Sequence, residues 1–154
     1  MHSKEEAYKL ASPGDHKKYY DKWSGKYDEE FVESENYKYP EKISKLFMNL
    51  AELKHSPIAD IGCGTFTFGH LGPEYLVRVI QMLDEGGLGV IGINKAHYLS
   101  KNFDEEIKLL ESTGKVYNVK IFEELIYSDR KTDEDKNIKD DEISNILTFF
   151  SSSA

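Results

Sequence analysis

The sequence predicts an α/β domain in which strands alternate with helices and most strands run parallel. The main observation is the near-continuous apolar run Leu88–Ile93, which is typical of a parallel strand that helices cover on both faces. A second apolar run, Ile58–Ile61, leads directly into a glycine-rich turn. Helical patterns flank both runs. This alternation favours a mainly parallel sheet with flanking helices.

Two amphipathic helices are expected before the first strand. From Asp15, which suits a helix N-cap, aromatic residues recur at helical spacing as far as Phe31. Pro40 suits the first turn of a second helix, and Pro57 follows the end of its apolar pattern. The aromatic face of the first helix consists of Tyr20, Trp23, Tyr27 and Phe31.

The second half of the chain predicts two helices and two strand regions. Pro73 opens a helix that the glycine pair Gly86-Gly87 ends, and the strand Leu88–Ile93 follows. Phe103–Thr113 has the spacing of a further helix. Val116–Tyr127 alternates as one long strand or two short ones.

The chain has 154 residues, the length of one domain that can bury a core without disulfides or metals. Residues 1–14 are expected to form a flexible leader, and residues 15–128 the folded domain. Residues 129–154 combine a charge run with a serine-rich end, so we expect a disordered acidic tail.

Charge and cysteine content limit the function. The net charge of −8 argues against nucleic-acid binding and favours small-molecule or protein partners. The single cysteine, Cys63, excludes an internal disulfide and a cysteine-cluster zinc site, so we expect it to be a small buried residue and expect no metal. The beginning of the chain has no signal-peptide pattern, and no run approaches membrane-spanning length. We therefore expect a cytoplasmic protein with no membrane partner.

The strongest candidate for a binding site is the turn Asp60-Ile61-Gly62-Cys63-Gly64-Thr65. In an open α/β sheet, ligands bind at the carboxyl ends of the strands, and glycine there lets the backbone approach a nucleotide-like ligand closely. Many tight turns need glycine for conformation alone, so the other motifs of the chain decide the interpretation.

Together, four features resemble the class I S-adenosylmethionine-dependent methyltransferases. These features are the aromatic helix Tyr20–Asp28, the turn Asp60–Gly64, the Gly86-Gly87-Leu88 step and the closing helix and strand. The stretch Phe66-Thr67-Phe68-Gly69-His70-Leu71-Gly72-Pro73 is similar to one in the methyltransferase-like proteins of the Williams–Beuren syndrome region. The resemblance covers about residues 19–128.

The resemblance implies a Rossmann-like fold and methyl transfer from S-adenosylmethionine to a small-molecule acceptor. Gly62 and Gly64 would border the methionine part of the cofactor, Asp60 would steady the turn, and Tyr27 would close over it. Core packing is the alternative role for Tyr27. His70 could act as a general base near the substrate, although we favour a role in structuring the loop. Such enzymes rely on proximity and orientation, so no catalytic residue is assigned.

The chain departs from the family after Thr65, where two βα units and a further strand are absent. These would span about 60 residues at about 30 per unit. They include the carboxylate that binds the ribose hydroxyls and the polar residue that orients adenine. Charged hydrogen bonds of that kind contribute about 1.5–3 kcal/mol each, so we expect S-adenosylmethionine to bind no tighter than about 1 mM.

Two alternatives stay open. In the first, the chain is a shortened, inactive isoform that acts at most as an interaction fragment, and the loss of strands exposes a sheet edge that favours self-association. In the second, it is a plain α/β binding domain unrelated to methyl transfer, which would leave the four combined motifs to coincidence.

Overall fold

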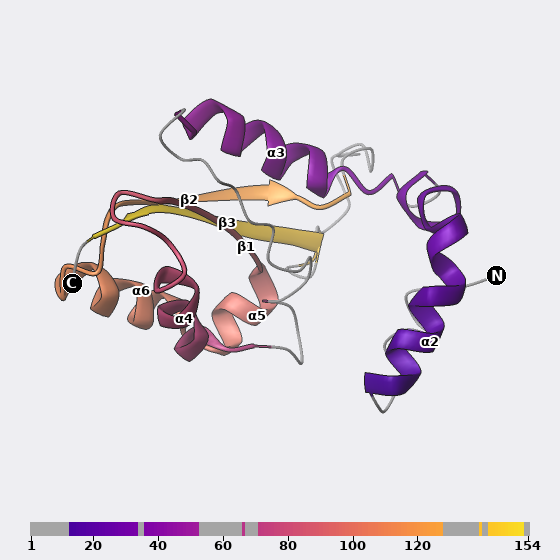
Figure 1. The fold of residues 1–154 in the computed structure, drawn as a ribbon, viewed down its shortest axis with the longest axis horizontal. Coiled ribbons are helices and arrows are strands. Elements are labelled where there is room, and N and C mark those ends of the chain that lie inside the picture. The colour runs from indigo at the N-terminus through magenta and orange to yellow at the C-terminus, as the bar shows by residue number, and fades with distance from the viewer. Residues whose placement is uncertain are drawn as a thin grey trace.

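The computed structural model describes residues 13–33, 36–52, 66, 71–127, 139 and 142–152. These residues form a mixed α/β structure in which a three-stranded sheet lies between helices (Figure 1). The sheet has the order β1-β3-β2. Its strands are β1 (Leu88–Asn94), β2 (Val116–Leu125) and β3 (Ile143–Ser151).

The expectation of a mainly parallel sheet is wrong for these strands, because β3 pairs antiparallel with both β1 and β2. Since β1 and β2 are both antiparallel to β3, they run in the same direction as each other. Without β3, they look like neighbours in a parallel sheet. The parallel pairing that the described residues contain is the isolated bridge between Phe66 and Ile93.

The expectation of a disordered tail is wrong for residues 143–151, which form the central strand. Because an acidic run precedes this strand, the sequence pattern predicted a tail, although the strand itself contains apolar residues. Ile146, Leu147 and Phe149 are all buried. The rest of the predicted tail lies outside the described residues, apart from Lys139, Glu142 and Ser152, and so does the predicted leader up to residue 12.

Helices cover both faces of the sheet (Figure 1). One face carries α3 (Tyr39–Leu50), and the other carries α4 (Leu76–Ile80), α5 (Lys95–Ser100) and α6 (Phe103–Ser112). The short helix η4 (Pro73–Tyr75) leads into α4. The N-terminal segment stands apart, beyond the end of β2, and comprises α2 (Pro13–Trp23), η1 (Ser24–Lys26) and η2 (Asp28–Glu33).

Local sequence signals explain most of these elements. Pro40 lies in the first turn of α3, as predicted. Gly114, at φ +71, follows the end of α6 in the left-handed conformation that glycine adopts readily. The predicted region Val116–Tyr127 is mainly one long strand with a bulge at Asn118, where φ is 53.

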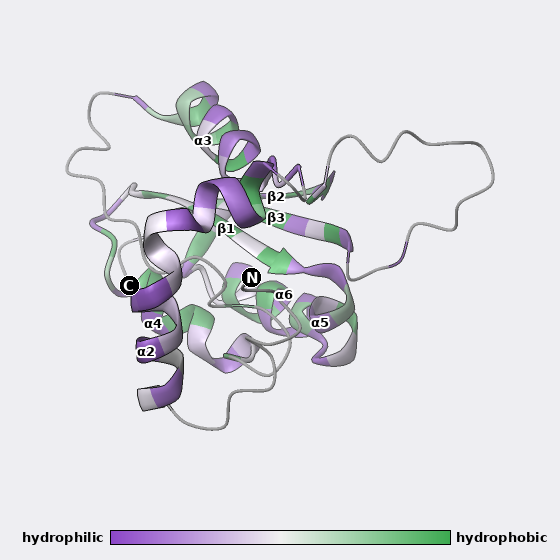
Figure 2. Cartoon of the chain, turned by 90° about the vertical axis from the view of Figure 1, so that its right-hand side faces the viewer, coloured by the Kyte–Doolittle hydropathy of each residue, from purple (hydrophilic) through white to green (hydrophobic). Residues whose placement is uncertain are grey.

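The main core lies between the sheet and α4–α6. Apolar residues of the strands are enclosed between the helix layers, whereas α2 is mostly hydrophilic (Figure 2). Gly89 on β1 faces the ring of Phe149, which leaves no room for a Cβ atom. The buried residues of this core are Phe66, Leu76, Ile80, Ile93, Tyr98, Phe103, Ile107, Leu110, Val116, Leu147 and Phe149.

Candidate functional site

Most of the sequence-predicted site lies outside the described residues. This applies to Asp60, Gly62, Gly64 and His70, and also to Cys63. The structure describes Tyr27, and it describes Phe66, the first residue of the Phe-Thr-Phe-Gly-His stretch. The described part of the site therefore consists of these two residues and the end of β1 that Phe66 contacts.

Phe66 lies at the carboxyl end of β1. Its carbonyl accepts a hydrogen bond from the backbone N–H of Asn94 at 3.2 Å, and it forms a parallel bridge with Ile93. Its side chain is buried and meets the ring of Phe103 edge-on at 5.9 Å. Phe66 therefore lies at the edge where open α/β sheets bind ligands.

The turn from β1 into α5 is fixed by two side chains. The side chain of Asn94 accepts a hydrogen bond from the N–H of His97 at 3.2 Å, which caps α5. His97 is fully buried, and its Nε2 lies 2.9 Å from the carbonyl oxygen of Leu71. Because a carbonyl can only accept, Nε2 carries the proton. His97 thus attaches the chain at Leu71 to α5.

Two adjacent glutamates at the end of β2 hold helices on opposite faces of the sheet. Glu123 pairs with Lys95 of α5 at 2.9 Å, and Glu124 pairs with Lys42 of α3 at 3.0 Å. Lys42 also donates to the carbonyl of Leu125 at 2.9 Å. Both glutamate side chains are about half exposed, so each pair contributes at most about 1 kcal/mol. Both carboxylates nevertheless have lysine partners already.

Tyr39 fixes the start of α3 on the sheet. Ser144 donates its hydroxyl proton to the carbonyl of Ile93 at 3.1 Å, so it accepts from the Tyr39 hydroxyl at 2.5 Å. The same hydroxyl occupies the position that a Cβ at Gly92 would take. A glycine within β1 therefore allows α3 to approach the strand closely.

Tyr27 lies in a row of aromatic side chains. Its ring centroid is 4.9 Å from Trp23 and 5.2 Å from Phe31. The row continues from Phe31 to Tyr37 at 5.1 Å and from Tyr37 to Tyr127 at 5.9 Å. Trp23 is only 2% exposed. These ring contacts of Tyr27 agree with the packing alternative, while its role as a lid stays a prediction.

Asn145 is a buried polar residue that sequence reasoning missed. It pairs in register with Ile93 on β1 and Glu123 on β2, so its side chain shares their face of the sheet. The residue is 5% exposed, and its Oδ1 has no hydrogen-bond partner among the described residues. A buried carbonyl oxygen of this kind is available as an acceptor, and only the position of β3 reveals it.

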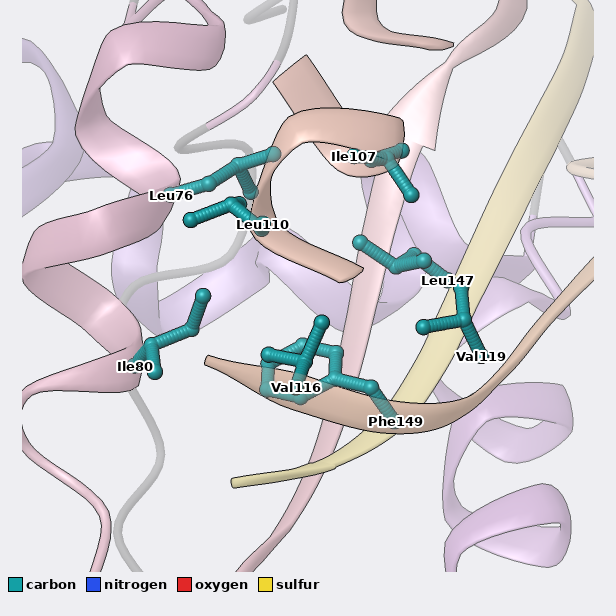
Figure 3. A pocket seen from close by; sticks show the side chains of 8 residues that line it. All are labelled: Leu76, Ile80, Ile107, Leu110, Val116, Val119, Leu147 and Phe149. Carbon is teal, nitrogen blue, oxygen red and sulfur yellow. The ribbon is translucent and has the colours of Figure 1, made fainter. Parts of the chain in front are cut away.

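The cavity in the core is not a ligand site. It has a volume of about 10 Å³, close to the least that holds one water, and only apolar side chains line it (Figure 3). Its walls are Leu76, Ile80, Ile107, Leu110, Val116, Val119, Leu147 and Phe149.

A larger hollow of about 250 Å³ lies between α6 and β2 and is open to solvent. Burial, and secondly the carboxylate of Asp104, raise the pKa of Tyr98 in its wall. A hydrogen bond from Lys108 lowers the pKa of Asp104. The hollow is smaller than typical ligand pockets, which measure about 300–1,000 Å³.

The described ranges contain neither a possible metal-binding cluster nor a helix suited to cross a membrane. No three His, Cys, Asp or Glu side chains there come together as a possible metal site. None of the helices described has the length and apolar character that a membrane crossing requires.

Protein-family models, curated proteins and solved structures all give no match to this chain. The functional assignment therefore depends on the residues themselves.

Proposed function

We propose that this chain is a reduced, Rossmann-like methyltransferase domain that retains part of an S-adenosylmethionine site and binds that cofactor only weakly. The ancestral reaction is methyl transfer to a small molecule. The observation that carries the proposal is the parallel bridge between Phe66 and Ile93, which brings the start of the Phe-Thr-Phe-Gly-His stretch to the carboxyl end of β1.

The strand arrangement supports a relation to doubly wound folds. β1 and β2 run in the same direction, and β1 is covered by helices on both faces, as strands of parallel sheets are. Mixed sheets that add an antiparallel strand to parallel ones are common among doubly wound folds, and here β3 is the antiparallel strand, in the central position of the sheet. The Gly86-Gly87 step precedes β1, with Gly86 at φ +72.

Weak rather than tight binding follows from the polar groups near this edge. A cofactor of this type needs a carboxylate for its ribose, yet Glu123 and Glu124 are paired with lysines. Asn145 Oδ1 is an open acceptor, but one neutral hydrogen bond contributes only about 0.5–1.5 kcal/mol. Gly62, Gly64, Asp60 and Tyr27 would then supply the shape of a site without its full set of polar contacts.

An interaction fragment is the second candidate function. It is favoured by exposed apolar side chains on β2, namely Tyr117, Ile121 and Phe122. Exposed apolar groups on one strand are typical of a protein-binding surface.

Nuclear magnetic resonance with S-adenosylhomocysteine tests where the cofactor would bind. On titration of the labelled chain to about 5 mM ligand, amide shifts are expected at Asn94, Lys95 and His97. Gly87 and Leu88, at the opposite end of β1, should not shift. Unchanged spectra, or shifts confined to the opposite end, would overturn the proposed site.

Two glycine variants make this titration specific. Gly64→Val should abolish the shifts, because a bulky side chain would block the approach of ligand to backbone. Gly25→Val is the matched control, since a Cβ at Gly25 meets no atom within 4 Å. Equal shifts in both variants would remove Gly64 from the site.

A further inference from the structure

The outer edge of β2 has the features of a strand-pairing surface. The order β1-β3-β2 leaves one side of β2 without a partner strand among the described residues. Ile121 is 43% exposed and Phe122 is 36% exposed. Their side chains lie on opposite faces of the sheet, because successive residues of a strand alternate.

The hydrogen-bond pattern identifies the backbone groups that point outward. The N–H of Ile126 donates to the carbonyl of Glu142 at 2.9 Å, and the strand register continues this pairing toward Lys120. In an antiparallel pair, every second residue bonds to the same neighbour, so residues 124, 122 and 120 face β3. Ile121 and Glu123 therefore direct their N–H and C=O groups to the open edge.

Charge makes this edge selective. Lys120 has no ion-pair partner in the described part of the chain, and a lysine on an edge strand opposes unspecific pairing. The bulge at Asn118 limits the regular edge to the residues that follow it. Only a strand that places an acidic residue opposite Lys120 would compensate its charge.

We propose that β2 pairs antiparallel with β2 of a second copy of this chain, about a two-fold axis at Phe122. In this register, Lys120 lies opposite Glu124 of the partner subunit, and the same pair recurs on the other side of the axis. Within each chain, Glu124 Oε2 pairs with Lys42, so Lys120 of the partner subunit approaches the second carboxylate oxygen, Oε1. Ile121 then exchanges backbone hydrogen bonds with Glu123 of the partner subunit. Glu123 exchanges backbone hydrogen bonds with the partner's Ile121. The result is a continuous six-stranded sheet.

Charge and burial favour this register over its neighbours. A shift of two residues in one direction places Lys120 opposite Phe122 of the partner subunit, which leaves the lysine uncompensated. A shift in the other direction places Phe122 opposite the partner's Glu124, which sets an apolar ring against a carboxylate. A shift of one residue would turn the side chains of one strand to the opposite face of the sheet relative to those of the other strand. The two-fold register instead brings the exposed Phe122 rings together.

The interface is small, so the dimer should be weak. Five regular residues on each strand bury less than the approximately 1,200 Å² of a standard interface. We therefore expect dimers at a chain concentration of about 100 µM and monomers at about 1 µM.

Sedimentation of the full chain over that concentration range tests the pairing. Lys120→Glu should weaken the dimer at least tenfold, because it sets four acidic groups against one another. Glu124→Lys should do the same. The double swap, Lys120→Glu with Glu124→Lys, should restore dimerisation to within about threefold of the parent chain.

The matched control is Lys101→Glu, which makes the same charge change on an exposed lysine outside β2 and should leave the dimer unchanged. A chain that stays monomeric at 500 µM would overturn the proposal. So would a dimer that Lys120→Glu does not weaken, because another surface would then hold it. Growth beyond dimers would point to open-ended association instead of a two-fold pair.

Discussion

The two ends of the described chain differ in how far along the sequence their contacts reach. The N-terminal segment, residues 13–33, is rich in aromatic residues, and Trp23 contacts four rings that lie within eight residues of it, those of Tyr19, Tyr20, Tyr27 and Phe31. β3 follows an acidic run, yet it pairs with both other strands. A strong local pattern is enough to predict a helix or strand. How much of the fold depends on that helix or strand is decided by its contacts with residues distant in the sequence.

The largest expected effect comes from β3. Phe149 is buried against Gly89 and the α4–α6 core, so Phe149→Ala should lower the free energy of unfolding by about 3–5 kcal/mol in urea denaturation. Phe150→Ala is the matched control, because this ring is only half buried and stacks on Tyr117. Similar losses in both variants would show that β3 does not bury Phe149 as described.

A smaller effect is expected where α3 meets β1. Gly92→Ala places a Cβ on the Tyr39 hydroxyl and should cost about 1–3 kcal/mol of unfolding free energy. In a Tyr39→Ala background the same change should cost much less, which a double-mutant cycle measures. An equal cost in both backgrounds would mean that Tyr39 is not the group that Gly92 accommodates.

The N-terminal segment should unfold before the sheet. Trp23 is the single tryptophan, so its fluorescence reports on the aromatic row, while far-ultraviolet circular dichroism follows the whole chain. The fluorescence transition should occur at a lower urea concentration than the circular dichroism transition. Phe31→Ala should shift the fluorescence midpoint to still lower urea and leave the circular dichroism midpoint unchanged. Coincident transitions in both proteins would show that the segment is part of the main core.

The smallest expected effect is on pH dependence. Burial, with Asp104 second, raises the pKa of Tyr98 above its ordinary value near 10. The unfolded chain then loses this proton first, so stability is complete below about pH 10 and falls as the pH rises further. Tyr98→Phe should flatten the decline in unfolding free energy above pH 10. An unchanged slope would assign the decline to other groups.

Elements with a clear local period could be predicted from the sequence. β1, α6 and the long region of β2 are confirmed, and Pro40 begins α3 as expected. β3 could not be predicted, since its apolar residues follow an acidic run and its burial depends on two strands that precede it by 18 residues or more.

The same division applies to the candidate site. The strand Leu88–Ile93 was predicted from its apolar run, and Asn94 ends it and caps α5. The roles of His97, Asn145 and the two lysine–glutamate pairs depend on contacts between distant segments, so no local pattern indicates them.

The most direct test of the central claim is calorimetry of the full chain with S-adenosylhomocysteine. The incomplete set of polar groups at the carboxyl end of β1 predicts heats that do not saturate below about 1 mM, which corresponds to a binding free energy near −4 kcal/mol. Saturation at micromolar ligand with one molecule bound per chain would contradict the account, because a complete nucleoside site would then be present.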